Sequence, residues 1–393
     1  MKNHRLAVIS LVARCAIGFF GLLQVRSALP IFGITGLAQI ASAATFLSAG
    51  ILLESGLAWN LRVRISQVSG QEILVLVHQA FRRLIYFCLP ISLLCFVSLV
   101  WVQSSSVRLI FTILFLTLIN ILFLPWLRLL EGIGQQHITI IIQILTSFLV
   151  LIFTLLNVSS MNILQFALVA NSGTLLTSIM VYVFCKFKFK RFVPNGASYL
   201  EGTSNIAILH RDSLIVVLSG TLMFCFFPTI YHWNNGDIFV AQSGIQLRIF
   251  SLMIGVIGVV GTQLQIMGRT RVETNKYLLK IQIFMSPLLI LSFVLSDNLL
   301  QYFVLGKGND FNLIESLAYG VLASLVASQI QSSADEFRKF GLRFQARSYA
   351  ICAFFFLIGC GMVQVFNFSL VWYTCVIYYF LHIQPLRKRI ARS

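Results

Sequence analysis

Five charged residues fall inside apolar stretches that are long enough to cross a lipid bilayer: Arg14, Arg26, Glu54, Arg248 and Glu315. A charged group in the hydrocarbon core is costly, so such residues are candidates for sites that bind ions or charged ligands. Guanidinium groups bind phosphate oxygens through two parallel hydrogen bonds. A cavity with several arginines and few acids would therefore suit an anionic substrate.

Arg14 and Arg248 lie deepest in their stretches. At 1.5 Å per helical residue they lie roughly 12 Å and roughly 15 Å into a core about 30 Å thick. We expect both to line a cavity, with a structural ion pair, such as Arg14 with Glu54, as the alternative. Arg26 and Glu315 lie near outer ends, where extension of the side chain to the membrane surface is an equally good interpretation. Glu54 is also a candidate carrier of a coupling proton.

Sequence motifs for other chemistry are missing. The chain has no phosphate-binding G-x-x-x-x-G-K-[ST] loop, no H-E-x-x-H and no G-x-S-x-G. The eight cysteines lie in apolar runs without a C-x-x-C pair, which is typical of small buried side chains. We therefore predict no catalytic residue, no metal site and no cofactor, and we expect that the protein is not an enzyme.

The amino-acid composition indicates that the lipid bilayer surrounds most of the chain. Of 393 residues, 58% are hydrophobic and 10% are charged, whereas soluble domains carry about 25% charged residues. These charged residues are too few to form the surface of a soluble protein. We therefore predict an all-α integral membrane protein of about twelve helices. The spans are expected at 6–29, 36–59, 84–102, 109–127, 138–156, 163–184, 213–231, 238–262, 278–295, 312–330, 348–365 and 368–383.

The distribution of basic residues supports this topology. If the N-terminus is cytoplasmic, most of the 29 lysines and arginines lie in inner segments, and the outer segments hold only Arg108 and Lys307. Cytoplasmic loops are enriched in Lys and Arg. Both termini are therefore predicted to be cytoplasmic, and the net charge of +17 is attributed to the inner membrane surface and not to nucleic acid. Arg14 interrupts the first stretch and no A-x-A site follows, so we expect a membrane helix that is retained.

The longest inner connection divides the chain into two halves. We predict an N-terminal six-helix bundle (1–190), a cytoplasmic connector (191–212) and a C-terminal six-helix bundle (213–393). The inner segment 61–83 is expected to be an amphipathic interfacial helix or a cytoplasmic extension of the two neighbouring spans. The apolar run 299–305 is expected to lie on the membrane surface, within an outer connection at 296–311.

Four short segments carry a resemblance to a known family: Leu29-Pro30 followed by Gly36–Gln39, Gly236–Gln242, Leu130–Gln136 and Gln301–Gly306. With the topology, they resemble the oligosaccharide-lipid flippases of bacterial polysaccharide biosynthesis, the O-antigen flippase family. The resemblance implies a cavity lined by the first, second, seventh and eighth helices. Arg14, Arg26, Glu54 and Arg248 would then lie on lining helices, with Gln39 and Gln242 as polar neighbours.

The resemblance also implies a function. Such proteins carry a sugar chain linked by pyrophosphate to undecaprenol from the inner to the outer leaflet of the bacterial inner membrane. The expected partners are this lipid-linked oligosaccharide, membrane lipids and other membrane proteins of polysaccharide assembly. Two alternatives stay open: an ion-coupled drug or metabolite antiporter of the same superfamily, and a membrane enzyme such as a polymerase, which would need a long outer loop or an acidic cluster.

Overall fold

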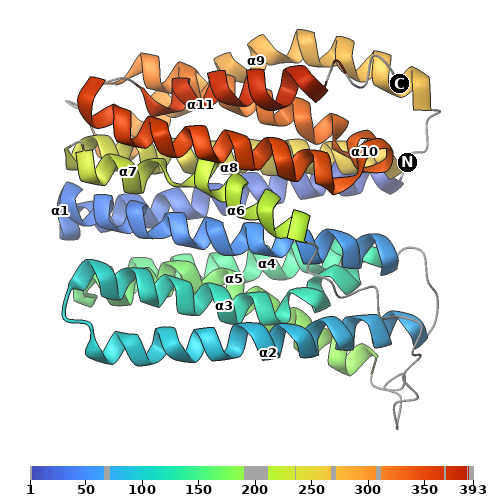
Figure 1. Cartoon of the computed structure of the whole chain (residues 1–393). Helices are drawn as coiled ribbons and strands as arrows, with labels where there is room; N and C mark the ends of the chain where they lie inside the picture. Colours follow the sequence, from blue (N-terminus) through green and yellow to red (C-terminus); the bar gives the residue numbers. More distant parts are fainter. Residues whose placement is uncertain are drawn as a thin grey trace. The chain divides into compact units, whose positions relative to one another are not determined.

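The computed structural model describes residues 2–65, 71–189, 211–234, 236–266, 271–306, 311–366, 369–386 and 388. Within these ranges every regular element is helical, which confirms the predicted all-α class. The elements are α1 (Lys2–Ile65), α2 (Gln71–Trp101), α3 (Ser105–Gly132), α4 (Gln136–Asn157), η1 (Val158–Ser160), α5 (Ile163–Lys188), α6 (Arg211–Cys225), α7 (Phe227–Asn234), α8 (Asp237–Ile266), α9 (Arg271–Leu305), α10 (Leu313–Phe366), α11 (Leu370–Tyr378) and η4 (Tyr379–Ile383) (Figure 1).

The surfaces of these helices suit a bilayer. Within the described residues, eight helical segments are long and apolar enough to cross a membrane. On α4, Leu149, Phe153 and Leu156 are all more than half exposed. A helix with large apolar side chains on its outward face needs hydrocarbon and not water as its solvent. The chain is therefore a multi-pass membrane protein.

The helix α1 combines the first two predicted spans. It is 64 residues long, roughly 96 Å if it were straight, and it is interrupted at Gly33, where φ is 64° and ψ is −174°. Essentially only glycine populates this backbone conformation. Pro30 lies one turn earlier and cannot donate a backbone hydrogen bond. The predicted end of the first span at Pro30 thus corresponds to a break three residues later.

Two further predictions can be compared with the structure: the end of the ninth span and the conformation of the inner segment 61–83. The ninth span was expected to end at residue 295, but α9 continues to Leu305 without a break. The segment 299–305 is therefore the end of a candidate membrane span and not a separate surface segment, because no Gly or Pro lies between residues 295 and 306. Helix α1 runs on to Ile65 and α2 begins at Gln71, so the inner segment extends the neighbouring spans.

Contacts divide the chain into two compact units. Unit 1 combines Met1–Ser42 with Ser219–Ser393, and unit 2 comprises Ala43–Leu218. The predicted domains divide the chain at the 191–212 connector, whereas the contacts place the first 42 residues with the C-terminal half. The division into two six-helix bundles stays a prediction.

Unit 2 is built from α2, α3, α4 and α5, of which α2 packs on α3, and α5 on both α3 and α4 (Figure 1). An aromatic group formed by Phe81, Phe123, Trp126 and Tyr182 joins α2, α3 and α5. Among the described residues, polar bridges between these helices include Thr146 Oγ1 with Thr177 Oγ1 at 2.7 Å and Ser178 Oγ with Asn120 Oδ1 at 2.6 Å. Such hydrogen bonds hold helices together where lipid provides no hydrophobic driving force.

Unit 1 contains α1 up to Ser42, the end of α6 from Ser219, and the elements from α7 to η4. In it, α10 packs against α8, α9 and α11. Helix α10 is 54 residues long, and its apolar segments Leu313–Ser328 and Arg343–Val363 correspond to the tenth and eleventh predicted spans. This unit holds the candidate site.

Candidate functional site

Small residues bring α1 and α8 into close contact within unit 1. A Cβ added at Gly244 would lie 2.5 Å from the Cβ of Ala41, and one added at Gly18 would lie 3.0 Å from Leu252 Cδ1. Thr35 Oγ1, also on α1, donates to Asp237 Oδ2 at the start of α8 over 2.7 Å. The interface between the two helices therefore leaves no room for larger side chains at these glycines.

Arg248 extends from α8 to the backbone of α1. Its Nη1 donates to the carbonyl oxygen of Gly21 over 3.3 Å, and the residue is exposed. A Cβ at Gly21 would lie 3.4 Å from the same nitrogen, so glycine makes room for the guanidinium. A guanidinium has five N–H donors, and within the described residues no carboxylate pairs with Arg248. Arg248 therefore keeps donors that are free for an anionic ligand.

Arg26 lies five residues after Gly21 on α1, roughly 7.5 Å further along the helix. Its Cζ is 4.1 Å from the ring centroid of Phe303 on α9, and the residue is exposed. A cation–π contact of this kind orients the guanidinium without neutralising it. The structure adds a specific contact with α9, and the choice between the two interpretations of Arg26 stays a prediction.

The other predicted site residues are on the same helices. Gln39 on α1 is half-buried, and Gln242 on α8 is buried. Arg14 and Glu54 both lie on α1, but their side chains fall outside the part of the chain that the structure describes. The proposed pair of these two residues, and the proton-carrying role of Glu54, stay predictions. The side chain of Arg248 thus contacts α1 at Gly21, five residues before Arg26.

Glu315 does not extend to the membrane surface. It is 3% exposed, near the start of α10, and both of its carboxyl oxygens accept hydrogen bonds. Tyr231 Oη on α7 donates to Oε1 over 2.5 Å, and Ser369 Oγ, before α11, donates to Oε2 over 2.6 Å. Three elements of unit 1 therefore meet at one buried carboxyl. The surface interpretation of this residue is wrong.

Asp297 is a second buried carboxyl, which the sequence analysis placed in an outer connection. It is wholly buried on α9. Gln246 Nε2 on α8 donates to Oδ2 over 2.9 Å, and Gln301 Nε2 on α9 donates to Oδ1 over 2.8 Å. One sequence signal could have found it: Asp297 and Gln301 are four residues apart, on one face of a helix whose apolar pattern continues to Leu305.

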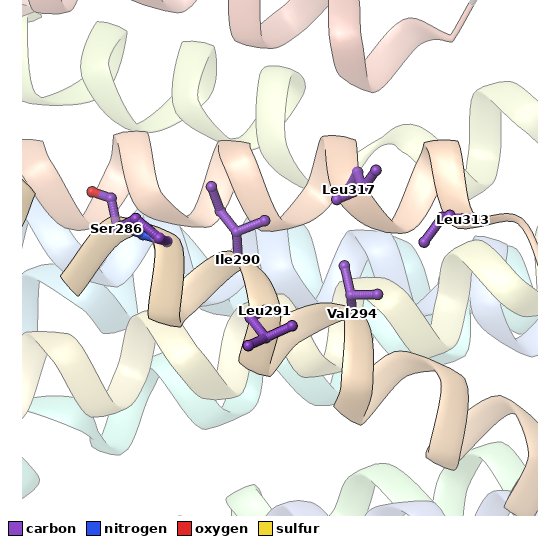
Figure 2. A pocket seen from close by; sticks show the side chains of 7 residues that line it. Ser286, Ile290, Leu291, Val294, Leu313 and Leu317 are labelled. Atoms are coloured by element: carbon purple, nitrogen blue, oxygen red, sulfur yellow. The ribbon is translucent and has the colours of Figure 1, made fainter. Parts of the chain in front are cut away.

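An apolar groove lies between α9 and α10. It has a volume of about 760 Å³ and is lined by Ser286, Pro287, Ile290, Leu291, Val294, Leu313 and Leu317. Figure 2 shows Ile290, Leu291 and Val294 on one helix and Leu313 and Leu317 on the other. The lining offers almost no polar partner, so the groove suits a hydrocarbon chain and not a charged group. Within the described residues, no cluster of three or more His, Cys, Asp or Glu side chains could hold a metal ion.

No protein-family model and no curated protein matches the sequence. Among solved structures, the chain is similar to an inward-facing multidrug resistance MATE family transporter of the MOP superfamily, with a TM-score of 0.62 and 16% identity over 98% of this chain and 95% of that chain. It is also similar to the MATE multidrug transporter DinF-BH, solved in complex with a ligand, with a TM-score of 0.58 and 14% identity over 100% and 95% of the two chains.

An outward-facing MATE family transporter of the MOP superfamily is similar as well, with a TM-score of 0.56 and 14% identity over 99% of this chain and 95% of that chain. Identities this low show a common fold and carry no assignment of substrate. Over almost its entire length, the chain therefore has the all-helical fold of the MATE transporters of the MOP superfamily.

Proposed function

We propose that the protein is a transporter that moves an oligosaccharide linked by pyrophosphate to undecaprenol from the cytoplasmic to the outer leaflet of the bacterial inner membrane. It does so by alternating access, with the pyrophosphate held by arginines and the lipid tail left in the bilayer. No catalytic residue and no cofactor take part.

The observation that carries this proposal is that Arg248 is exposed and has no acidic partner among the described residues. The residue lies roughly 16 Å along α8 from Asp237, it is exposed, and within the described residues it bonds only to a backbone carbonyl. A guanidinium at membrane depth without an acid partner is costly unless a ligand supplies the negative charge. Within the described residues no carboxylate pairs with Arg26 either, so α1 carries a second guanidinium near this position.

The membrane potential supports the proposed direction. Outward movement of a negative charge across an inside-negative membrane is favourable by about 2.3 kcal/mol per charge for each 100 mV. The charge of a pyrophosphate therefore favours export, and the arginines lower the cost of taking it through the hydrocarbon core.

A drug antiporter is the second candidate. The similar solved structures are multidrug transporters, one of them in complex with a ligand. Antiporters for cationic compounds usually present acidic or neutral cavities. In the described part of unit 1, Asp297 and Glu315 are buried and hydrogen bonded to neutral groups, and Asp237 at the start of α8 accepts from Thr35. The exposed side chains Arg26 and Arg248, further along α1 and α8, are cationic. This charge distribution favours the anionic substrate.

Complementation of a strain that lacks the gene tests the proposal. We expect Arg248→Ala to abolish surface polysaccharide and to cause lipid-linked intermediates to accumulate on the inner face, with normal membrane abundance by blot. Arg14→Ala is tested in parallel as the second predicted phosphate ligand. Arg108→Ala is the matched control, because Arg108 in unit 2 also donates to a backbone carbonyl, that of Val102.

Three results separate the candidates. Normal export with both Arg248→Ala and Arg14→Ala would exclude the pyrophosphate-binding role of these arginines. Intact export after deletion of the gene, together with altered drug resistance, would favour the antiporter. Loss of polymerised sugar without accumulation of intermediates on the inner face would indicate an enzyme of polysaccharide assembly.

A further inference from the structure

We propose that the Asp297 carboxyl on α9 is a proton-binding site of the transport cycle, separate from the arginines of α1 and α8. This inference concerns what changes the conformation of the protein, and it does not depend on which substrate is carried.

The first argument is the burial of this carboxyl. Asp297 is wholly buried, and its two amide partners, Gln246 and Gln301, are nearly so. It lies within the membrane-spanning segment Ser286–Leu305. An ionised carboxylate taken out of water loses hydration free energy, which neutral hydrogen-bond donors recover only in part. Protonation removes this cost.

The second argument is the lack of a compensating cation. The charged and titratable groups of the surrounding helices have other partners. On α8, Arg248 bonds to the Gly21 carbonyl. On α10, Glu315 accepts from Tyr231 and Ser369, and Tyr319 Oη is 2.8 Å from Ser243 Oγ.

On α1, Arg26 lies over Phe303. Within the described residues, no charged side chain forms an ion pair or hydrogen bond with Asp297. A bound proton would supply the positive charge that the described side chains do not.

The third argument is an available hydroxyl. Ser316 on α10 is wholly buried and lies beside the Asp297 carboxyl. Its Oγ has no hydrogen-bond partner of good geometry within the described residues. A hydroxyl can donate to the carboxylate or accept from the protonated carboxyl. A hydroxyl that can reverse its role in this way allows the site to change between its two protonation states without leaving a polar atom unsatisfied.

The amide of Gln246 provides the same adaptability. Its nitrogen faces Asp297 now, but rotation by half a turn would present its carbonyl oxygen to a protonated carboxyl. Gln246 precedes Arg248 by two residues on α8. A proton at Asp297 thus favours the packing of α8, α9 and α10 shown here, and loss of the proton favours a conformation in which water reaches the carboxylate. Any effect of this change on Arg248 rests on the proposed function.

Infrared spectroscopy of the purified full-length protein tests the site without any substrate. The C=O stretch of a protonated carboxyl absorbs at higher frequency than the amide and carboxylate bands. We expect such a band at neutral pH. It should shift to lower frequency when aspartate carries ¹³C, disappear in Asp297→Asn and weaken in alkaline buffer, where the protonated fraction falls roughly tenfold per pH unit.

Two further variants keep the result unambiguous. Asp237→Asn should retain the band, because Asp237 lies at the start of α8 and is only partly buried. If Asp297→Asn does not fold, Asp297→Glu keeps the carboxyl but removes it from the labelled residues, so the isotope shift should be lost. The absence of an isotope-sensitive band at neutral pH, or its persistence in Asp297→Asn or Asp297→Glu, would overturn the proposal. Complementation with Arg248→Ala reports on the substrate independently, so the two proposals can fail separately.

Discussion

Gln246 on α8 holds Asp297 on α9 through a hydrogen bond of 2.9 Å between Nε2 and Oδ2. Both residues are buried, and Gln301 occupies the other carboxyl oxygen. The bond joins two successive membrane-spanning helices through their interior. Its partners are 51 residues apart in the chain, so it depends on the correct packing of α8 on α9.

We therefore expect Gln246→Leu to destabilise the protein. The variant keeps the side-chain volume but leaves Oδ2 of Asp297 with a buried, unsatisfied acceptor, which costs about 1–3 kcal/mol. Thermal unfolding in detergent measures the loss. In Asp297→Asn the side chain stays neutral and hydrogen bonded after reorientation of an amide, so this variant should retain most of the stability. Equal melting temperatures for Gln246→Leu and the wild type would contradict this role of Gln246.

The close approach of α1 and α8 predicts a compensating pair of substitutions. In Gly244→Ala, the new methyl group would lie 2.5 Å from the Cβ of Ala41, and such overpacking costs about 1–3 kcal/mol. Ala41→Gly in the same protein removes that methyl group and should restore much of the melting temperature. Gly361→Ala on α10 is the control, because no atom lies within 4 Å of its added Cβ. If Ala41→Gly does not raise the melting temperature of Gly244→Ala, the contact between these two residues is not the cause of the destabilisation.

The buried carboxyl of Glu315 predicts the effect of losing a tyrosine hydroxyl. Tyr231→Phe removes the donor to Oε1 and should lower stability by about 1–3 kcal/mol, because the acceptor stays buried. Tyr373→Phe should have a smaller effect, since Tyr373 is only partly buried and its Oη donates to the Phe355 carbonyl. Unfolding curves for both variants in the same detergent decide this. A larger loss of stability in Tyr373→Phe than in Tyr231→Phe would contradict this prediction.

The break in α1 predicts a strict requirement for glycine. At Gly33, φ is 64° and ψ is −174°, and a side chain in this region costs about 1–3 kcal/mol. Space is not the reason, because no atom lies within 4 Å of an added Cβ. Gly33→Ala should therefore lower the melting temperature and the yield of inserted protein, whereas Gly361→Ala should not. Wild-type behaviour of Gly33→Ala would mean that the break relaxes without loss of stability.

Local sequence patterns were enough to predict the membrane-spanning segments. Whether a segment is apolar over about 20 residues, and which connections are basic, are local properties, because the bilayer acts on each segment separately. The break after Pro30, the arginine on α8 and the two apolar segments of α10 were predicted on this basis. Errors of the prediction occurred at helix ends, where a single polar residue such as Asp297 resembled the start of a loop.

The contacts of each polar side chain, in contrast, depend on the packing of distant helices. Arg248 bonds to Gly21 across 227 residues, and Tyr231 bonds to Glu315 across 84. A single Asp, Glu or Arg has the same identity at the membrane surface and in the interior, so its burial depends on which helices pack around it. This packing follows from the fit of small residues such as Gly244 against Ala41, which no local pattern specifies.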